Sequence, residues 1–383
     1  MTDQSAPYDF IIAGAGCAGL SLAMQLRNSN VPFKKVLILD KEQKNTNDRT
    51  WCFWTKDNSH WYESVIFRQW TRFRFNSSEF GKEFNIEPYR YCMIRAQDFY
   101  AYCHEELGSD KRFEFKTEEL QSIGTDKGKA FAKTSHGIYQ SEWLFNSAFR
   151  NIALKKSDIN FVQHFTGWLI ETSKDVFDTD CPLFMDFNVP QKEDCRFVYV
   201  LPHHQRMAMI EYTGFSPAPI SEKEYEEELR EFIKKTYGCT QYTIHETETG
   251  IIPMYESSFI NPHGERVMNI GTAGGHTKPS TGFTFIFIQQ AVHELINSLE
   301  RSSFSHWTFK RPSRFLYYDK ILLDVMQRKK VSSESVFTAL FRKNQVSSLL
   351  AFLNEESTFS QELAIMNSVP KIEFTRSALR KLF

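Results

Sequence analysis

The glycine pattern near the start of the chain constrains the fold more than any other feature of the sequence. Gly14, Gly16 and Gly19 follow a strand-like apolar run and precede a helix-like segment, and a second apolar run ends at Asp40. That acid comes about 20 residues after the last glycine, the usual spacing for a ribose contact. The first glycine permits a tight turn, the second lets a phosphate approach the backbone, and the third lets helix and strand pack closely. The order predicts a dinucleotide-binding βαβ unit.

A second glycine-rich segment lies far downstream, where a strand-like run from 267 is followed by Gly271, Gly274 and Gly275. The first motif by itself does not separate NAD from FAD. Its place at the start of the chain, with inserted strands and a late second glycine segment, favours FAD, because a long flavin needs the fold to return and cover its far half. Taken alone, the second segment also fits a structural turn.

The remaining patterns predict two interleaved domains and a helical end. Alternating aromatic and polar residues at 51–91 and 175–212 are typical of antiparallel strands, whereas 95–107, 222–236 and 283–299 are helix-like. We therefore expect an α/β fold in which a Rossmann-like FAD-binding domain, of the flavin monooxygenase type, is interleaved with an antiparallel-sheet substrate domain. The expected bounds are 1–60, 91–170 and 250–300 for the FAD-binding domain, 61–90 and 171–249 for the substrate domain, and 301–383 for the helical C-terminal region.

Composition excludes some classes of partner and site. Lys and Arg total 46 against 47 Asp and Glu, so charge gives no reason to expect nucleic acid. The seven cysteines are scattered without a CxxC pair, and the histidines lack metal-ligand spacing, so we expect neither disulfides nor a metal site in a cytoplasmic protein. We see no signal peptide and no uninterrupted apolar span. The 35 Phe fit an aromatic core or a long apolar substrate site.

Several short motifs, in order and spacing, resemble the lycopene cyclase family, in particular the bacterial β-cyclases, over most of the chain. They are Asp48–Trp54, Gln163–Phe165 with Gly167-Trp168, Met185–Phe187, Ile210–Thr213, Gly250–Met254 and Gly271–Gly282. Two departures stand out. Many relatives have two adjacent acids where Glu211 is followed here by Tyr212, and related flavoproteins carry an acid where this chain has Thr272.

The resemblance implies a lycopene β-cyclase, an isomerase that closes the ψ-ends of lycopene to β-rings in carotenoid biosynthesis. It implies reduced FAD without net electron transfer, with NAD(P)H as the reductant, and no obligate protein partner. One alternative is an FAD-dependent oxidoreductase of the same fold, either a hydroxylase or a polyprenyl reductase. Another is a non-catalytic protein that binds FAD or carotenoid.

Cyclisation of this kind needs a proton donor, a dry site and tolerance of a carbocation. Burial keeps a carboxyl protonated, and Glu211 stands at the end of an apolar strand candidate, where it also fits a surface carboxylate. Asp186 is the second candidate acid, either to receive the final proton or to orient Glu211. We therefore take Glu211 and Asp186 as the candidate catalytic residues.

Other residues are candidates for the cation and the cofactor. The cation would be stabilised by aromatic faces, for which the candidates are Trp51, Phe53, Trp54 and Tyr212. Arg49, just past the second strand, is expected to contact the flavin or its phosphates, although a loop salt bridge also fits. Arg95 resembles a position at which related flavoproteins contact the cofactor.

The expected substrate is long and insoluble in water, so it must come from a membrane. We expect peripheral attachment to the inner face of the cell membrane. The apolar run Val346–Leu353, with Arg342 and Lys343 beside it, fits a helix lying in the membrane interface. The same stripe also fits a core helix.

Overall fold

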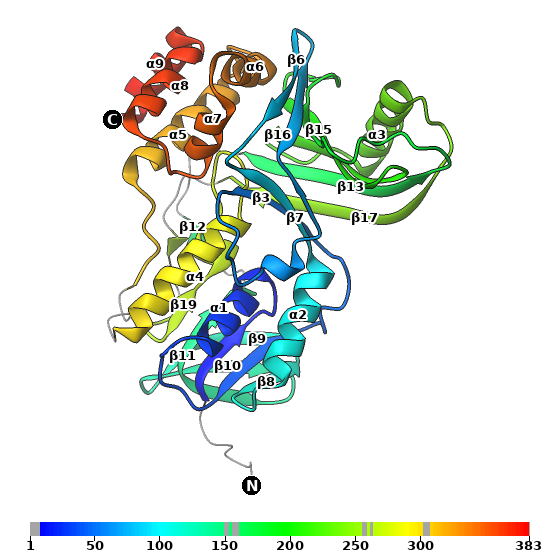
Figure 1. Cartoon of the computed structure of the whole chain (residues 1–383). Helices are drawn as coiled ribbons and strands as arrows, with labels where there is room; N and C mark the ends of the chain where they lie inside the picture. The colour runs from blue at the N-terminus through cyan, green and yellow to red at the C-terminus, as the bar shows by residue number, and fades with distance from the viewer. Residues whose placement is uncertain are drawn as a thin grey trace.

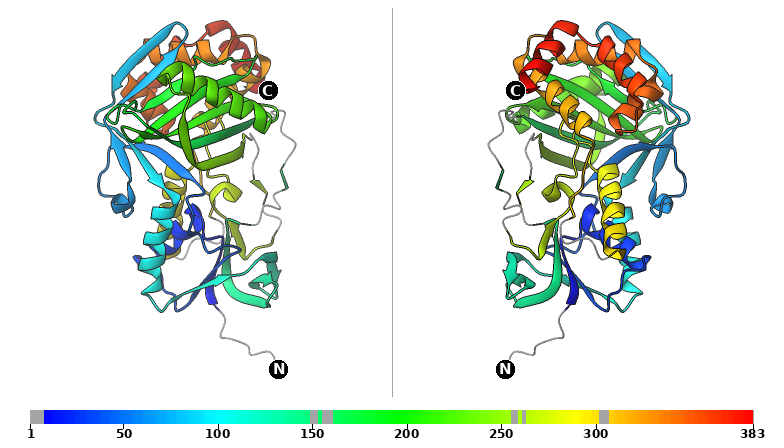
Figure 2. Two further views of the ribbon diagram at one scale, coloured as in Figure 1. Left: turned by 90° about the vertical axis from the view of Figure 1, so that its right-hand side faces the viewer. Right: turned by 90° about the vertical axis from the view of Figure 1, so that its left-hand side faces the viewer.

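Two large sheets and a helical region make up the computed structural model of the chain (Figure 1). It describes residues 8–148, 161–254, 263–301 and 307–382, together with the backbone of β12 (Ala153–Leu154) and β18 (Phe259–Ile260), which pair with each other. The views of Figure 2 place the C-terminal helices beside the antiparallel sheet, at the opposite end of the molecule from the parallel strands. The mixed α/β architecture predicted from sequence is confirmed.

The first sheet is built around the N-terminal strand. β1 (Tyr8–Ala13) lies between two parallel neighbours, β2 (Val36–Asp40) and β11 (Ile138–Asn146). The sheet is completed by β8 (Phe113–Thr117), β19 (Val267–Asn269), β9 (Leu120–Asp126) and β10 (Lys129–Thr134). Nearly all residues of β1 and β2 are buried, as expected for parallel strands covered on both faces.

Three helices cover one face of this sheet. They are α1 (Cys17–Arg27), α2 (Ala96–Gly108) and α4 (Phe285–Glu300), and they share one apolar cluster with alternate strand residues such as Ile12 and Ile38. On the other face, Ile11 and Leu39 pack against side chains of β9 and β10. The N-terminal βαβ unit therefore forms as its glycine and apolar pattern predicts.

The second large sheet runs β17-β13-β16-β15-β14-β5-β6. Its strands are β17 (Tyr242–Pro253), β13 (Val162–Thr172), β16 (Met207–Ser216), β15 (Cys195–His204), β14 (Leu183–Asp186), β5 (Arg72–Ser77) and β6 (Phe80–Asn85). Helix α3 (Glu222–Tyr237) packs on one face against an apolar cluster that includes Trp168 and Ile210. β13 belongs here, so this sheet begins before the expected boundary at residue 171.

A small sheet and a group of helices complete the molecule. β3 (Thr50–Thr55), β7 (Arg90–Arg95) and β4 (Arg68–Trp70) form the small sheet, and η1 is Glu63–Val65. The C-terminal helices are α5 (Ser313–Arg328), α6 (Ser333–Lys343), α7 (Val346–Leu353), α8 (Phe359–Ser368) and α9 (Lys371–Leu382). Leu349 and Leu350 of α7 are buried in a core shared with Phe73 and Phe184, so this apolar stripe is core and not a membrane face.

A buried group of four charges joins these helices to the loop before α4. Lys278 forms ion pairs with Asp319 (2.8 Å) and Glu355 (2.9 Å), and Arg311 also pairs with both carboxylates. All four side chains are at least nine-tenths buried. Because each carboxylate has two cationic partners, burial of the charges is compensated. The loop at 276–284 is thereby fixed against α5.

Candidate active site

One cavity of about 2080 Å³ extends from the N-terminal glycine turn to the antiparallel sheet. Its walls include Gly16 at the start of α1, Gly271–Gly275 after β19, and Glu211 on β16. Ligand pockets for one small molecule are usually about 300–1,000 Å³. The cavity therefore has room for a dinucleotide and a second ligand in one continuous space.

The three glycines of the N-terminal turn have different surroundings. Gly14 has a φ of +104°, and a side chain there would overlap Ser147. A Cβ on Gly19 would overlap the carbonyl oxygen of Gly14, because helix and turn are in close contact there. A Cβ on Gly16 would meet nothing within 4 Å. Gly16 therefore borders open cavity, where a phosphate can approach the backbone, and each glycine has the surroundings that its assumed role requires.

The N-terminus of α1 is free to receive an anion. Gly16 is its N-cap residue, no side chain caps the helix, and its first turn carries no acidic residue. The free N–H groups and the partial positive charge at this end attract phosphate. Asp40 lines the cavity beside the turn and accepts a hydrogen bond from the Ala15 N–H at 2.7 Å. This acid thus fixes the turn as well as facing the predicted ribose position.

The second glycine segment packs against the first. Gly271 has a φ of +63°, and a Cβ there would lie 2.7 Å from the Cβ of Ala18 on α1. The Gly271 N–H donates a hydrogen bond to Nδ1 of the buried His276 at 3.1 Å, and burial lowers the pKa of His276 to about 3. Gly274 and Gly275 also line the cavity. Two segments 250 residues apart in sequence therefore enclose the same space.

The two arginines predicted at the cofactor lie in different places. Arg49 lines the cavity, and its Nη1 donates to the carbonyl oxygen of Thr249 at 3.4 Å. Arg95 pairs with Asp98 at 2.6 Å, and its guanidinium lies 3.9 Å from the ring centroid of Phe67. Arg95 is not among the described residues that line the cavity. It is held at the start of α2, and its contact with the cofactor stays a prediction.

Of the two predicted acids, one lines the cavity and the other does not. Glu211 lines the cavity, and Thr213 donates a hydrogen bond to its Oε1 at 2.7 Å. Burial, and then the charge of Glu248, raises the pKa of Glu211 to about 8. Asp186 is 4% exposed and accepts hydrogen bonds from the side chains of Asn76 (3.0 Å) and Asn188 (2.8 Å). It lies outside the described cavity lining, so its expected catalytic role stays a prediction.

Of the four aromatic residues expected around a cation, Trp51 lines the cavity. Phe53 stacks on Phe285 with ring centroids 4.8 Å apart, and Trp54 donates its Nε1–H to the carbonyl oxygen of Leu350. Tyr212 is fully buried on the α3 face of β16, because adjacent strand residues point to opposite faces. Phe53, Trp54 and Tyr212 are therefore core residues that are not among the described lining of this cavity, and their role at a cation stays a prediction. The aromatic residues that do face the cavity near Glu211 include Tyr91, Phe165, Tyr199 and Phe283.

The sequence analysis missed Glu248, which lines the cavity from β17. Burial raises the pKa of Glu248 to about 7, against hydrogen bonds from Thr50 and the positive charge of Arg49. The sequence around it, Thr247-Glu248-Thr249, is typical of an exposed strand. Sequence alone gives no signal for Glu248, because its burial depends on its pairing opposite Gly167 of β13.

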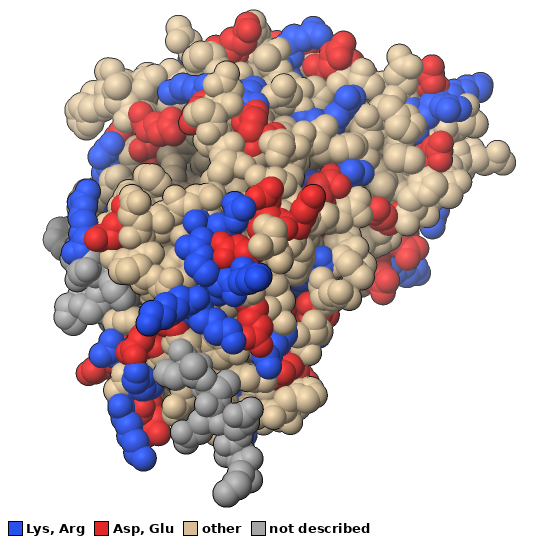
Figure 3. Space-filling view, turned by 60° about the horizontal axis from the view of Figure 1, so that its bottom comes forward, with Lys and Arg blue, Asp and Glu red and all other residues tan. Residues whose placement is uncertain are grey.

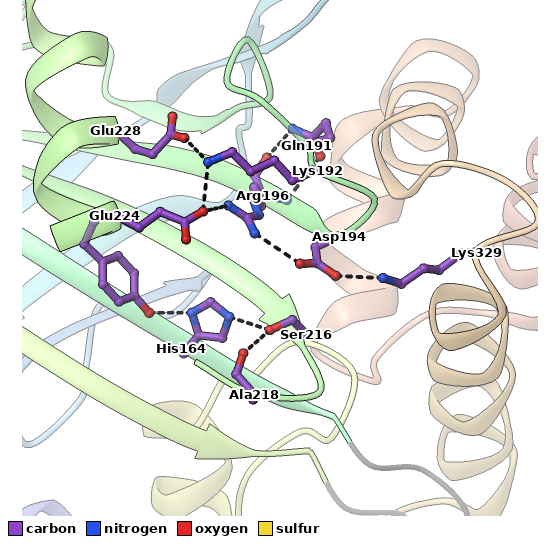
Figure 4. A network of polar contacts seen from close by, with 11 residues as sticks. His164, Gln191, Lys192, Asp194, Arg196, Ser216, Ala218, Glu224, Glu228 and Lys329 are labelled. Atoms are coloured by element: carbon purple, nitrogen blue, oxygen red, sulfur yellow. Dashed lines mark hydrogen bonds and ion pairs between the residues drawn. The ribbon is translucent and has the colours of Figure 1, made fainter. Parts of the chain in front are cut away.

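The opposite face of the same sheet carries a separate polar network (Figure 4). There His164 contacts the Tyr225 hydroxyl and Ser216 Oγ (2.8 Å), while Arg196 pairs with Glu224 (2.7 Å) and Asp194 (3.2 Å). Burial lowers the pKa of His164 to about 4, so the imidazole is neutral. The network joins β13, β15 and β16 to α3. Within the described parts of the chain, no His, Cys, Asp and Glu side chains are grouped to hold a metal ion.

Sequence comparison identifies relatives over most of the chain. A family model described as "Lycopene cyclase protein" matches residues 9–379. A lycopene beta-cyclase of Pantoea ananas is 21% identical over 328 residues, which cover 79% of this chain and 81% of that protein.

Solved structures share the fold at low sequence identity. A flavoprotein/dehydrogenase from Cytophaga hutchinsonii has a TM-score of 0.66 at 13% identity, covering 98% of this chain and 99% of that one. A geranylgeranyl bacteriochlorophyll reductase-like protein from Thermoplasma acidophilum has a TM-score of 0.64 at 14% identity, with the same coverage. A halogenase, PltM, in complex with FAD, has a TM-score of 0.61 at 13% identity, covering 98% and 91%.

Two of these neighbours are described as a flavoprotein and as a halogenase in complex with FAD, and the shared architecture confirms the Rossmann-like α/β fold class expected from the glycine turn. The family match spans both large sheets and the C-terminal helices. The chain therefore belongs to the lycopene cyclase family.

Proposed function

We propose that this protein is a lycopene β-cyclase, an isomerase that closes the ψ-ends of lycopene to β-rings, giving γ-carotene and β-carotene. The observation that carries the proposal is Glu211, a carboxyl group with a pKa raised to about 8 in a cavity continuous with the N-terminal glycine turn. Such a group is protonated at neutral pH and can act as an acid towards an alkene. Family membership supplies the substrate class.

FAD is the cofactor that the first half of the cavity fits. Gly14, Gly16 and the free N-terminus of α1 would hold its pyrophosphate, Asp40 a ribose, and Gly271–Gly275 the ribityl side. Arg49 would contact the flavin or its phosphates. In its reduced form, with NAD(P)H as the reductant, the flavin would supply negative charge next to the cavity in which a cation develops.

The second half of the cavity supports the chemistry of the substrate. The hydrogen bond from Thr213 fixes one oxygen of Glu211, so its remaining oxygen is available to transfer a proton to the terminal alkene. Ring faces of Trp51, Phe165 and Tyr199 would stabilise the resulting cation by about 0.5–2 kcal/mol each when desolvated. The apolar walls limit capture of the cation by water.

We also propose that the protein attaches to the inner face of the cell membrane through α8 and α9. No described helix is long and apolar enough to cross a bilayer. Large apolar side chains are nevertheless exposed on these two helices, including Phe359 (67%), Ile372 (66%) and Leu379 (57%). The cavity lining reaches Tyr317 on α5 and Lys381 on α9. An apolar substrate would thus enter the cavity beside the attached face. At the other end of the molecule, basic and acidic side chains are interspersed (Figure 3).

The test is expression in a bacterium that accumulates lycopene, followed by chromatography of the pigments. The wild-type chain should convert lycopene to γ-carotene and β-carotene, and Glu211→Gln should leave lycopene unchanged. With purified protein in heavy water, each new ring should gain one deuterium, whereas deuterium-labelled nicotinamide should label none. Label from nicotinamide in the product would contradict a redox-neutral reaction.

The likeness to a reductase-like protein supports one alternative, an FAD-dependent oxidoreductase such as a hydroxylase or a polyprenyl reductase. Such an enzyme would consume nicotinamide in proportion to product, whereas a cyclase would need it only to reduce the flavin. A non-catalytic protein that binds FAD or carotenoid would leave the pigments unchanged in both wild type and variant.

A further inference from the structure

Four residues form one row across the antiparallel sheet. Tyr199 on β15 pairs with Glu211 on β16, Glu211 with Gly167 on β13, and Gly167 with Glu248 on β17. Residues directly opposite each other in antiparallel strands point to the same face. The three side chains of the row accordingly all line the cavity.

Gly167 stands between the two acids of this row, and the side chains of Met209 and Glu211 lie close over it. A Cβ placed on it would lie 3.1 Å from Sδ of Met209 and 3.4 Å from Cβ of Glu211. Neighbouring strands are about 4.8 Å apart, so the backbones of Glu211 and Glu248, two strands apart, are separated by about 10 Å. Two acids that project from one face of the sheet with this backbone separation can reach different atoms of one bound group.

The surroundings of Glu248 differ from those of the rest of its strand. Of the twelve residues of β17, all of which the structure describes, Glu248 alone is buried. It is 6% exposed, and its buried Oε2 has no hydrogen-bond partner within the described parts of the chain. An unpaired buried carboxylate oxygen is costly, and such groups are concentrated at functional sites. The free oxygen is thus a candidate proton acceptor.

We propose that Glu248 is the base that receives the ring proton at the end of cyclisation, while Glu211 is the acid that starts it. This inference rests on the proposed function. The Glu211 O–H bond breaks and its proton forms a C–H bond at the terminal alkene, leaving a tertiary cation. The next double bond closes the ring onto that cation. A C–H bond beside the new cation then breaks, its electron pair forms the ring double bond, and its proton goes to Glu248.

The cycle conserves protons and electrons. One proton enters the substrate and one leaves it, so Glu211 ends as a carboxylate and Glu248 as an acid. Loss of that proton from Glu248 to water, and uptake of a proton from water by Glu211, restores the starting state. The pKa values agree with these roles, because that of Glu211 is raised to about 8 and that of Glu248 to about 7.

The other ionisable groups near the pair do not titrate between pH 6 and 9 in a way that would mimic it. Burial raises the pKa values of Cys52, Tyr91 and Tyr199 on the cavity side of Glu211, and of Tyr225 on the opposite face of the sheet, so these groups stay neutral. Near Glu248 lie the charges of Asp48 and Arg49. The rate should therefore follow a bell-shaped pH profile. Its two apparent pKa values belong to the coupled pair and not to either residue alone.

The test compares Glu248→Gln with Glu248→Asp, and uses Glu246→Gln as the matched control. Glu246 is on the same strand and face but pairs with Asn47 at 3.0 Å and does not line the cavity. Glu248→Gln should lower the rate of β-ring formation about 10²–10⁴-fold, the usual contribution of a general base. It should also remove the acidic limb of the pH profile and yield rings with a displaced double bond. Glu248→Asp should restore part of the rate, and Glu246→Gln should match wild type.

Flavin content, melting temperature and the infrared band of protonated carboxyls provide readouts that do not depend on turnover. Glu248→Gln should keep wild-type flavin content and melting temperature at pH 6, and should lose one titrating carboxyl band. A Glu248→Gln variant that forms normal β-rings within threefold of the wild-type rate would refute the role of Glu248 alone. A wild type that closes no rings would instead refute the proposed function, and the role of Glu248 with it.

Discussion

Replacing Gly16 with alanine should remove flavin from this protein without unfolding it. A Cβ at Gly16 meets no atom within 4 Å, and its φ of −84° is open to any residue. Alanine is worse than glycine at an N-cap by about 0.5–1 kcal/mol, whereas the restriction that alanine places on the unfolded chain stabilises the fold by about 0.4–1 kcal/mol. These effects nearly cancel, so the free energy of unfolding without cofactor should stay within about 1 kcal/mol of wild type.

The cost should appear in cofactor binding instead. The added methyl group enters the space through which a pyrophosphate would reach the N–H groups of α1. A hydrogen bond to a charged group contributes about 1.5–3 kcal/mol, and losing one such bond corresponds to an increase of about 10–100-fold in Kd for FAD. Flavin absorbance after dialysis and fluorescence titration of the apoprotein would measure this change.

Gly19→Ala is the matched comparison, because it makes the same chemical change three residues away. Its Cβ would overlap the carbonyl oxygen of Gly14, so helix α1 must move away from the turn. Overpacking of this kind costs about 1–3 kcal/mol and should lower the melting temperature even without FAD. If Gly16→Ala retained wild-type flavin affinity, or if Gly19→Ala left the apoprotein unchanged, the assignment of roles to these glycines would be refuted.

Three further predictions follow from other parts of the molecule. Burial raises the pKa of Glu211 from 4.5 to about 8, so the folded state loses stability relative to the unfolded state as pH rises through this range. Glu211→Gln should therefore melt at a higher temperature than wild type at pH 9 but not at pH 5. Ile372→Gln with Leu379→Gln should reduce co-sedimentation with anionic lipid vesicles while leaving flavin content unchanged; equal binding would contradict attachment through α9. Lys278→Met removes one of the two cations that pair with the buried Asp319 and Glu355, and should lower the free energy of unfolding by about 3–5 kcal/mol. Denaturant unfolding measures this change, and an unchanged free energy would show that water solvates the two carboxylates.

Sequence alone predicted the cofactor side of the molecule better than the substrate side. The glycine turn, α1 and Asp40 follow local rules of spacing and packing, so their arrangement could be read directly. The bounds of α2 and α3 differ from expectation by only a residue at either end. Alternation within a strand could also have excluded Tyr212, because it cannot face the same side as Glu211.

The second acid could not be found in the same way. Burial of Glu248 depends on its pairing opposite Gly167. The pairing of two strands about 80 residues apart cannot be derived from the sequence of either strand alone. Asp186 has apolar neighbours in sequence, yet Asn76, from a distant strand, satisfies its carboxylate. Likewise β13 was assigned to the wrong domain, because an apolar strand fits either sheet until its partners are known.

The position of β1 has a consequence for synthesis on the ribosome. This strand emerges first, but its neighbour β11 ends at Asn146, and β19, which follows in the sheet, ends at Asn269. A nascent chain therefore carries β1 with one edge unpaired until β11 is made, and β11 with one edge unpaired until β19 is made, about two-thirds of the way along the protein. Unpaired apolar strand edges of this kind are open to misassembly during synthesis.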